Sequence, residues 1–210
     1  MRSDPEKHRR RSIRLKGYDF GQAGAYFVTV CTQGRACLLG VVNGEMQVNN
    51  AGRMVQASWD ELPRRFAGMR VDGFVVMPNH IHGIIMVGAQ FIAPHDMQQN
   101  VFENPRQGAM NRAPTLGEIV RAFKAVSTRA IRQTTNPTFA WQRNYYEHVI
   151  RDDDSLNRIR QYILDNPARW AFDRENPAAT TPEPEEAWLA GSNPVSQTCP
   201  RSCHFNSCTK

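Results

Sequence analysis

The stretch Val71-Asp-Gly-Phe-Val-Val-Met-Pro-Asn-His-Ile-His-Gly-Ile-Ile-Met-Val87 predicts a β-hairpin at the centre of the fold. Residues 71–77 and 80–87 are rich in β-branched and apolar side chains, and the Pro-Asn pair between them is a turn signal. Side chains alternate between the two faces of a strand, so His80 and His82 share one face and Ile81 points to the other. The hairpin therefore carries a buried layer and two neighbouring imidazoles.

The pattern on either side of this hairpin predicts an α+β protein. The predicted elements are a strand over Ala25–Thr32, a hairpin turning at Asn43-Gly44, a helix from Asn50 to Phe66 that Pro63 shortens or bends, a helix from the capping box at Thr115 to Gln133, a strand over Tyr145–Arg151, and a last helix that is capped by Asp153, Asp154 or Ser155 and that Pro167 ends. This order suits a ferredoxin-like antiparallel sheet with helices on one face.

The composition along the chain indicates one domain with three irregular segments. We predict a basic flexible arm over 1–16, a domain over 17–172, a loop insertion over 88–114 and a disordered tail over 173–210. The tail holds Cys199, Cys203 and Cys208, whose spacing with His204 is not that of a standard zinc finger, so free thiols are expected.

The charge distribution favours a polyanionic partner. Net charge is +6, and residues 173–210 hold three basic and five acidic residues, so residues 1–172 hold 23 basic against 15 acidic, a net +8. Such a surplus is typical of nucleic-acid binding, although a merely soluble basic surface is the alternative. We find no secretory signal and no apolar run long enough for a membrane helix, so a cytoplasmic location is expected.

The His80-Ile81-His82 strand is a candidate metal site, because two imidazoles on one strand face can share a divalent ion. Taken alone, the pattern is more typical of two polar residues on a solvent-facing strand. The last helix adds a possible partner: Tyr162 and Asn166 are four residues apart on one helix face, with Arg158 one turn earlier. These residues offer a phenol nucleophile, an amide oxygen as a third ligand and a guanidinium for phosphate. A tyrosine at the rim of the core is the alternative for Tyr162.

Three motifs together resemble the HUH single-tyrosine transposases, and most closely the REP-associated tyrosine transposases of bacteria. The motifs are Val75-Val-Met-Pro-Asn-His-Ile-His82, Trp141-Gln-Arg-Asn-Tyr-Tyr-Glu-His-Val-Ile-Arg151 and Tyr162-Ile-Leu-Asp-Asn-Pro167. The resemblance spans roughly residues 12–172, with the motifs in the family's order. The 88–114 segment and the cysteine-bearing tail match nothing in that family.

The resemblance implies a site and a reaction. His80, His82 and Asn166 would hold Mg or Mn, and Tyr162 would attack a phosphodiester of hairpin-forming single-stranded DNA. A 5′-phosphotyrosine on the protein and a free 3′-hydroxyl would result, and strand transfer would follow. Tyr145 and Tyr146 are rival nucleophiles. The protein would work as a monomer or a homodimer.

A nucleic-acid-binding protein that keeps this fold without catalysis is the second hypothesis. Both hypotheses need basic contacts to DNA, and one face of the 115–133 helix carries a basic stripe formed by Arg121, Lys124, Thr128 and Arg132. An ordinary solvated face is the alternative for that stripe. The DNA-binding candidates are Arg9, Arg10, Arg11, Arg14, Lys16, Arg121, Lys124 and Arg158.

Overall fold

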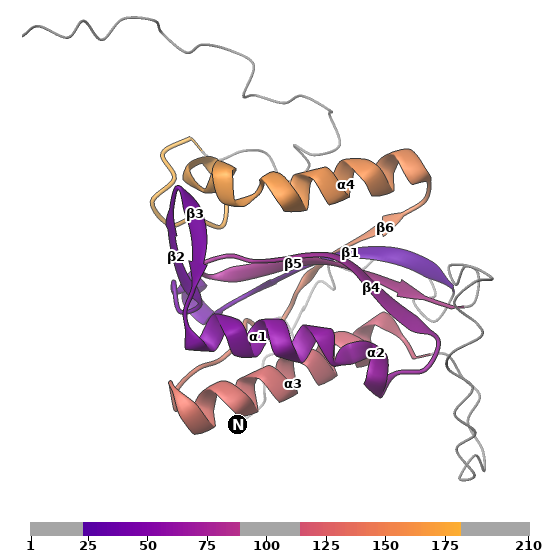
Figure 1. The fold of residues 1–210 in the computed structure, drawn as a ribbon, viewed down its shortest axis with the longest axis horizontal. Coiled ribbons are helices and arrows are strands. Elements are labelled where there is room, and N and C mark those ends of the chain that lie inside the picture. Colours follow the sequence, from indigo (N-terminus) through magenta and orange to yellow (C-terminus); the bar gives the residue numbers. More distant parts are fainter. Residues whose placement is uncertain (1–22, 89–113, 182–210) are drawn as a thin grey trace, which may run out of the picture.

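The protein is built on a four-stranded antiparallel sheet in the order β4-β5-β1-β6. The computed structural model describes residues 23–88 and 114–181, and Figure 1 shows how their elements are arranged. The elements are β1 (Gly24–Cys31), η2 (Gln33–Arg35), β2 (Gly40–Asn43), β3 (Glu45–Val48), α1 (Asn50–Asp60), α2 (Leu62–Arg65), β4 (Met69–Val76), β5 (His80–Val87), α3 (Leu116–Thr134), β6 (Tyr146–Ile150), α4 (Asp153–Asp165) and η5 (Pro167–Phe172). The α+β class and the ferredoxin-like sheet are confirmed.

Most of the element boundaries follow from local signals. The β2–β3 hairpin turns at Gly44, which has the positive φ of 75° that glycine favours. Helix α1 is capped by Asn49 and ends at Asp60, and the short α2, which carries Pro63 in its first turn, follows it from Leu62. The predicted capping box of α3 is present: the side chain of Thr115 accepts a hydrogen bond from the backbone N–H of Glu118, and the side chain of Glu118 accepts one from the backbone N–H of Thr115. Asp152, one residue earlier than predicted, caps α4.

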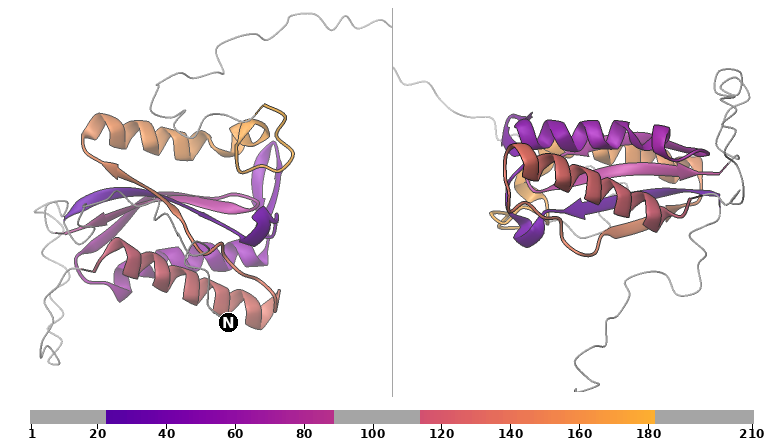
Figure 2. Two further views of the ribbon diagram at one scale, coloured as in Figure 1. Left: turned by 180° about the vertical axis from the view of Figure 1, so that it is seen from behind. Right: turned by 90° about the horizontal axis from the view of Figure 1, so that it is seen from below.

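Helices cover both faces of the sheet, so the expectation that they share one face is wrong for α4. In Figures 1 and 2, α1 and α3 lie on one side of the sheet and α4 lies on the other. The reason is that the central strands β1 and β5 are buried on both faces. The apolar edge of α4, formed by Leu156, Ile159 and Ile163, packs on Phe27 and Ile84, while Val28 and Ile81 face α1 and α3.

A close approach beside the two histidines requires a glycine. Gly83 follows His82 on β5 and faces the ring of Trp59 from α1; a Cβ at this position would lie 2.4 Å from Trp59 Cζ2. Trp59 is itself held by stacking on Phe74, with ring centroids 4.5 Å apart. The glycine therefore allows α1 to pack directly on β5, whose opposite face carries the imidazoles.

Several predicted segments lie wholly or largely outside the described residues: the arm at 1–16, the loop insertion at 88–114 and most of the tail. The first part of the predicted tail is described, and it returns to the sheet, since Asp173 is buried. The ordered fold thus continues past the boundary predicted at residue 172. Within residues 23–88 and 114–181, no helix is long and apolar enough to cross a membrane.

Candidate metal centre and nucleophile

His80 and His82 lie on the α4 face of β5, and both are buried, with exposed fractions of 0% and 4%. On the neighbouring strand β1, Cys31 pairs with His80 and Thr29 pairs with His82. The two Nε2 atoms face each other at 3.1 Å, so one small ion could be shared between them. The strand is central and covered on both sides, so the alternative of a solvent-facing His-x-His pair does not apply.

Asn79 sets the tautomer of His80. Its Nδ2 donates to two backbone carbonyls, those of Arg35 at 3.0 Å and Glu175 at 2.6 Å. These bonds fix the orientation of the amide, and Oδ1 is left to accept from His80 Nδ1 at 2.9 Å. Because Nδ1 must then carry the proton, Nε2 of His80 keeps its lone pair for a ligand.

His82 is oriented in the same way by β1. Its Nδ1 lies 2.8 Å from Thr29 Oγ1, and its ring stacks on Phe27 with centroids 5.2 Å apart. A hydroxyl accepts as well as donates, so Thr29 is compatible with the tautomer that turns the Nε2 lone pair toward His80. Both imidazoles are thus held by their Nδ1 atoms, as is usual for histidines that bind metals.

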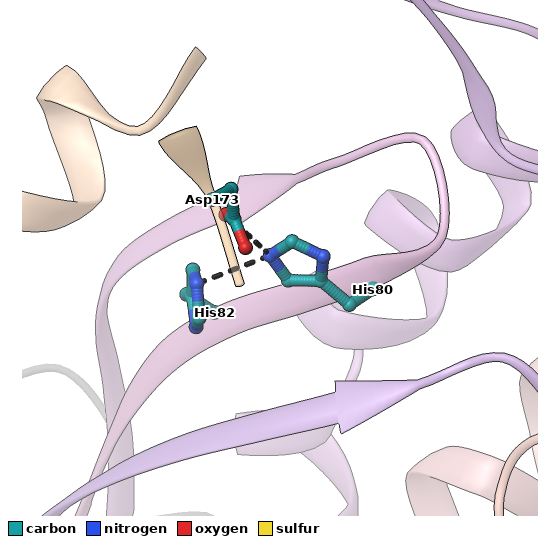
Figure 3. A group of neighbouring side chains, drawn as sticks. All are labelled: His80, His82 and Asp173. Atoms are coloured by element: carbon teal, nitrogen blue, oxygen red, sulfur yellow. Dashed lines mark hydrogen bonds and ion pairs between the residues drawn. The ribbon is translucent and has the colours of Figure 1, made fainter. Parts of the chain in front are cut away.

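Asp173 completes a group of three possible ligands, as Figure 3 shows. Its Oδ2 lies 3.6 Å from His80 Nε2, and the possible ligand atoms of His80, His82 and Asp173 all lie within 4.8 Å of one another. Oδ1 accepts from the backbone N–H of Glu175 at 2.7 Å, whereas the buried Oδ2 has no hydrogen bond. A buried carboxylate oxygen without a hydrogen bond is costly, and a bound cation would satisfy it.

The electrostatics of the pair suit metal binding. Burial lowers the pKa of His80 to about 3, with a smaller contribution from the charge of Arg35. Burial, followed by repulsion from His80, lowers the pKa of His82 well below its usual range. Both rings are therefore neutral at pH 7, and neutral imidazole is the form that binds a metal. The three residues could hold a divalent cation.

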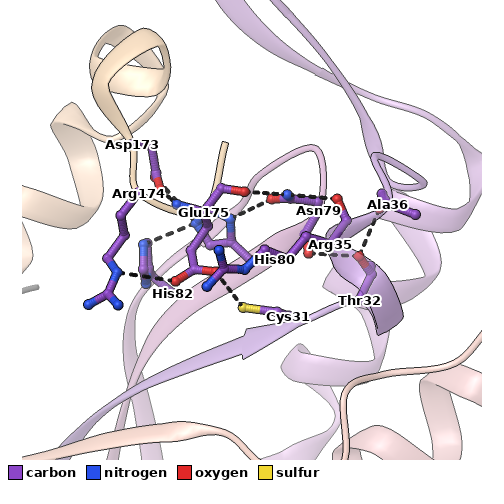
Figure 4. A network of polar contacts seen from close by, with 10 residues as sticks. All are labelled: Cys31, Thr32, Arg35, Ala36, Asn79, His80, His82, Asp173, Arg174 and Glu175. Carbon is purple, nitrogen blue, oxygen red and sulfur yellow. Dashed lines mark hydrogen bonds and ion pairs between the residues drawn. The ribbon is translucent and has the colours of Figure 1, made fainter. Parts of the chain in front are cut away.

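A second layer of polar contacts ties the segment around Asp173 to the sheet (Figure 4). The carboxylate of Glu175 lies 2.8 Å from Arg35 Nε and accepts from Cys31 Sγ at 3.3 Å. Burial and the neighbouring Glu175 raise the pKa of the Cys31 thiol, so Cys31 stays protonated and can donate. The chain after η5 is therefore fastened to β1 and η2 at the point where Asp173 meets the histidines.

Tyr162 lies beside this group. Helix α4 brings its ring to 5.3 Å from the ring of His82, measured between centroids, and sets it edge-on to Phe27 at 6.1 Å. The guanidinium carbon of Arg169 lies 5.8 Å from the centre of the tyrosine ring. The strand and the helix that sequence analysis pairs thus meet, which places a phenol next to the possible metal ligands.

Asn166, predicted as the third ligand, lies one turn beyond Tyr162 at the junction of α4 and η5. Its side chain is buried, and its Oδ1 has no hydrogen bond. That unsatisfied oxygen keeps Asn166 a candidate ligand in addition to Asp173.

The rival tyrosines fall on opposite faces of the sheet. Tyr145 packs on the α3 side, where Lys124 Nζ lies 5.4 Å from the centre of its ring. Tyr146 points to the α4 side, pairs across the strands with Thr29, and meets Phe27 edge-on at 6.4 Å. Of the two rivals, only Tyr146 shares a face with His80 and His82.

The predicted DNA contacts are placed only in part. The candidates at positions 9–16 lie outside the described residues. Arg121 on α3 and Arg158 on α4 are exposed, and Arg158 donates to Ser155 Oγ at 3.0 Å. The ammonium of Lys124 donates to the backbone carbonyls of Gln142 and Asn144, each at 2.9 Å, so it holds the chain that leads into β6.

Sequence reasoning missed Asp173 and Arg169. A signal for Asp173 was available, because it is the first acidic residue after the Trp170-Ala-Phe172 segment and carboxylates are common metal ligands. Placing the end of the domain at residue 172 excluded it. Arg169 is a buried cation packed on Tyr162, and no feature of the sequence pointed to that contact.

Comparison with known proteins supports the fold and gives a relative. The chain has the fold of the REP-associated tyrosine transposases: the structure of one such protein bound to a REP hairpin aligns with a TM-score of 0.50 and 20% identity, covering 76% of this chain and 74% of that one. An uncharacterized protein of Haemophilus influenzae is 42% identical over 170 residues, which cover 80% of this chain and 93% of the relative. The protein belongs to the same family as this Haemophilus relative. No family model matches the sequence.

Proposed function

We propose that this protein is a metal-dependent endonuclease and strand transferase for hairpin-forming single-stranded DNA, with Tyr162 as the nucleophile. The observation that carries the proposal is the position of Tyr162, 5.3 Å from His82 between ring centroids, next to a cluster of His80, His82 and Asp173 that could bind a metal. The fold is that of a protein whose structure was determined with a REP hairpin. By that likeness we propose palindromic-repeat DNA as the substrate and DNA transposition as the process.

The residues fit a Mg or Mn ion. Two neutral imidazoles and one carboxylate oxygen are suitable donors, and Asn166 Oδ1 is a further oxygen in need of a partner. When bound, such an ion would polarise the scissile phosphate and offset its negative charge. The fastening of Asp173 through Glu175 to Arg35 would keep the carboxylate in place without the ion.

In the proposed reaction the phenol oxygen of Tyr162 attacks phosphorus. The bond between phosphorus and the 3′-oxygen breaks, the phenol proton passes to water, and the 3′-oxygen takes up a proton from water. The protein then carries a 5′-phosphotyrosine and the DNA a free 3′-hydroxyl. Another 3′-hydroxyl can reverse the step and join the strands. Arg169, over the Tyr162 ring, places a positive charge beside the group that becomes the ester.

The test is a search for a covalent adduct. Labelled hairpin-bearing single-stranded DNA is incubated with the full chain and Mn or Mg, and the products are separated under denaturing conditions. We expect an adduct that is lost in Tyr162→Phe, in His80→Ala and with a chelator. Tyr145→Phe serves as the matched control, because its ring lies on the other side of the sheet.

Two outcomes would contradict the proposal. An adduct that persists in Tyr162→Phe and is lost in Tyr146→Phe would assign the nucleophile to β6. Tight DNA binding without any adduct in either metal would favour the second hypothesis, a binding protein that keeps the fold without catalysis.

A further inference from the structure

The side chain of Arg35 lies at the edge of the candidate metal site, and its guanidinium is only partly used by the fold. Its Nε lies 2.8 Å from Glu175 Oε2, and the side chain is 44% exposed to solvent. Within the described residues, no hydrogen bond engages its two terminal amino groups. The guanidinium is thus anchored on one side and offers a pair of donors on the other, which is the geometry that suits a phosphate group.

The backbone at Arg35 is strained, and several contacts hold it in place. Arg35 has a φ of 55°, in the left-handed region that residues other than glycine rarely adopt. Its carbonyl accepts from Asn79 Nδ2 at 3.0 Å, and its N–H donates to the carbonyl of Thr32 at 3.0 Å. Strained residues of this kind cluster at sites that bind or convert ligands, where the strain fixes a group in advance. The turn therefore sets the direction in which the guanidinium leaves the chain.

The charges around Arg35 favour an anion. The carboxylate of Glu175 contacts two guanidinium groups, because its Oε1 also lies 3.6 Å from Arg174 Nε (Figure 4). These two cations and one carboxylate carry a net charge of +1. Burial is the main cause of the lowered pKa of His80, and the charge of Arg35 adds to it, so the positive charge is felt within the group of possible metal ligands. A phosphate that comes next to His80 would be attracted to this charge.

Arg35 and Tyr162 lie at opposite ends of the group of possible ligands. The ring of Tyr162 lies beside that of His82, with 5.3 Å between centroids. His80 lies two residues away on the same strand, and its partner Cys31 is the last residue of β1. The η2 turn, which carries Arg35, follows this end of β1. The histidines thus lie between the phenol and the guanidinium.

The direction of the proposed reaction makes the Arg35 end the side of the leaving strand. In phosphoryl transfer the attacking and the leaving oxygen lie roughly in line, on opposite sides of phosphorus. When Tyr162 attacks from its own end of the group, the 3′-oxygen departs toward the other end, where Arg35 lies. The leaving strand continues from that oxygen toward its 5′ end, so its next phosphate lies on the same side.

We propose that Arg35 binds a phosphate of the DNA segment that ends in the freed 3′-hydroxyl, through its two terminal amino groups. This inference rests on the proposed function, which defines the cut and its two sides. Bound in this way, the 3′-oxygen stays in line with Tyr162 during cleavage. It also stays close enough to attack the 5′-phosphotyrosine when strands are rejoined, which gives the reverse step the advantage of proximity.

The test combines variants of the protein with DNA that lacks the charge of one phosphate. The position of the cut is first mapped with the wild type in the adduct assay. Hairpin-bearing single strands are then made with one uncharged methylphosphonate at successive phosphates on both sides of the cut. Their affinities for the full chain are measured by fluorescence anisotropy with a chelator present, so that no metal takes part.

Arg35→Gln is the variant, and Arg64→Gln is the matched control. Arg64 is an exposed arginine on α2 that also pairs with a carboxylate, that of Glu61 at 2.6 Å. Arg35→Lys is added because it keeps the positive charge but presents one ammonium in place of the planar fork.

For the wild type we expect one methylphosphonate on the 3′-hydroxyl side of the cut to lower affinity about tenfold, the size of a hydrogen bond to a charged group. Arg35→Gln should bind unmodified DNA about tenfold more weakly, and its slope of log affinity against log salt should be flatter by about 0.7. In Arg35→Gln the same methylphosphonate should have no further effect, whereas in Arg64→Gln it should act as in the wild type. Arg35→Lys should recover part of the affinity.

A merely structural role of Arg35 gives a different result. If Arg35→Gln only disturbed the fastening of Glu175, affinity would fall by the same factor for all substrates, and each methylphosphonate would keep its effect. That result, or a coupling of Arg35 to a phosphate on the tyrosine-linked side of the cut, would overturn the inference.

The adduct assay separates this inference from the proposed function. A wild type that forms the tyrosine adduct, without any coupling between Arg35 and a phosphate, contradicts only the inference about Arg35. A wild type that forms no adduct contradicts the proposed function, and with it the assignment of a leaving strand.

Discussion

Asn79 Oδ1 lies 2.9 Å from His80 Nδ1, and it can only accept there, because both hydrogens of the Asn79 amide go to backbone carbonyls. One of these carbonyls belongs to Arg35 in η2 and the other to Glu175 beyond η5. A single amide thus sets the protonation of a buried imidazole and joins two distant parts of the chain at the candidate metal site.

Replacing Asn79 should weaken metal binding without removing a ligand. In Asn79→Asp the carboxylate still accepts from His80 but cannot donate to the two carbonyls, so the ring loses its fixed orientation. We expect a 10- to 100-fold lower affinity for Mn, which is about the usual effect of removing such a supporting hydrogen bond. Isothermal titration calorimetry measures this, with the exposed Asn144→Asp as control. Equal affinity in Asn79→Asp and the wild type would contradict the assignment.

Asp173→Asn should affect the stability of the folded protein in opposite directions with and without metal. The substitution removes a buried charge whose Oδ2 has no hydrogen bond, and the Asn oxygen can still accept from Glu175 N. Without metal we therefore expect the free energy of unfolding of the variant to equal that of the wild type or to exceed it by up to about 1 kcal/mol. Added Mn at about 100 times Kd should stabilise the wild type by about 2.7 kcal/mol.

The same Mn concentration should stabilise Asp173→Asn far less. Differential scanning fluorimetry measures the thermal stability of the wild type and of Asp173→Asn, each with Mn and with a chelator. Glu175→Gln is the control, since it alters the fastening around the site but leaves the three possible ligands in place. Equal stabilisation of Asp173→Asn and the wild type by Mn would show that Asp173 is not a ligand.

The ion pair between Asp72 and Arg160 should stabilise the docking of α4 on β4 in a pH-dependent way. Arg160 Nε and a terminal amino group contact the two carboxylate oxygens at 2.9 and 2.6 Å. The hydrogen bond from Arg160 holds the pKa of Asp72 below its usual 3.8. A lowered folded-state pKa gives stability that is complete above the unfolded pKa and is lost as the pH falls through the folded one.

Asp72→Asn should therefore cost about 0.5–1 kcal/mol at pH 7, a small value because the Arg160 side chain is 40% exposed to solvent. The difference from the wild type should shrink below pH 3.8 and vanish once Asp72 is protonated in the folded protein. Urea unfolding at a series of pH values measures this. A difference that stays constant down to the lowest pH would mean that the charge of Asp72 plays no part.

Gly83→Ala should destabilise the fold through Trp59, because the new Cβ would lie 2.4 Å from the indole. We expect a loss of about 1–3 kcal/mol in the free energy of unfolding. Adding Trp59→Phe, which shortens the ring, should make the pair of changes cost less than the sum of the single ones. Gly73→Ala is the control, since its Cβ would meet Ile163 at an ordinary 3.4 Å. Strict additivity in the double variant would contradict this packing.

The sequence predicted those parts of the fold and site that depend on local patterns. The β5 strand, the capping box at Thr115 and the spacing of Tyr162 and Asn166 all follow from periodicity or capping. The side of the sheet on which α4 packs was not predictable in this way. The central strands are apolar on both faces, so a helix can pack on either one. Asp173 was missed for a related reason: its burial depends on contacts from Glu175 to Arg35, which are distant in the sequence.

The contacts of Asp173 also bear on when, during synthesis, the three possible metal ligands can come together. The histidines belong to a hairpin completed by residue 87, whereas the carboxylate beside them is made more than 80 residues later. Chains grow from the N-terminus, so a nascent chain can pair β1, β4 and β5 before Asp173 leaves the ribosome. A growing or broken chain that stops short of this residue carries the imidazole pair without the third of the possible ligands. The complete group of three can therefore form only after α4 has been synthesised.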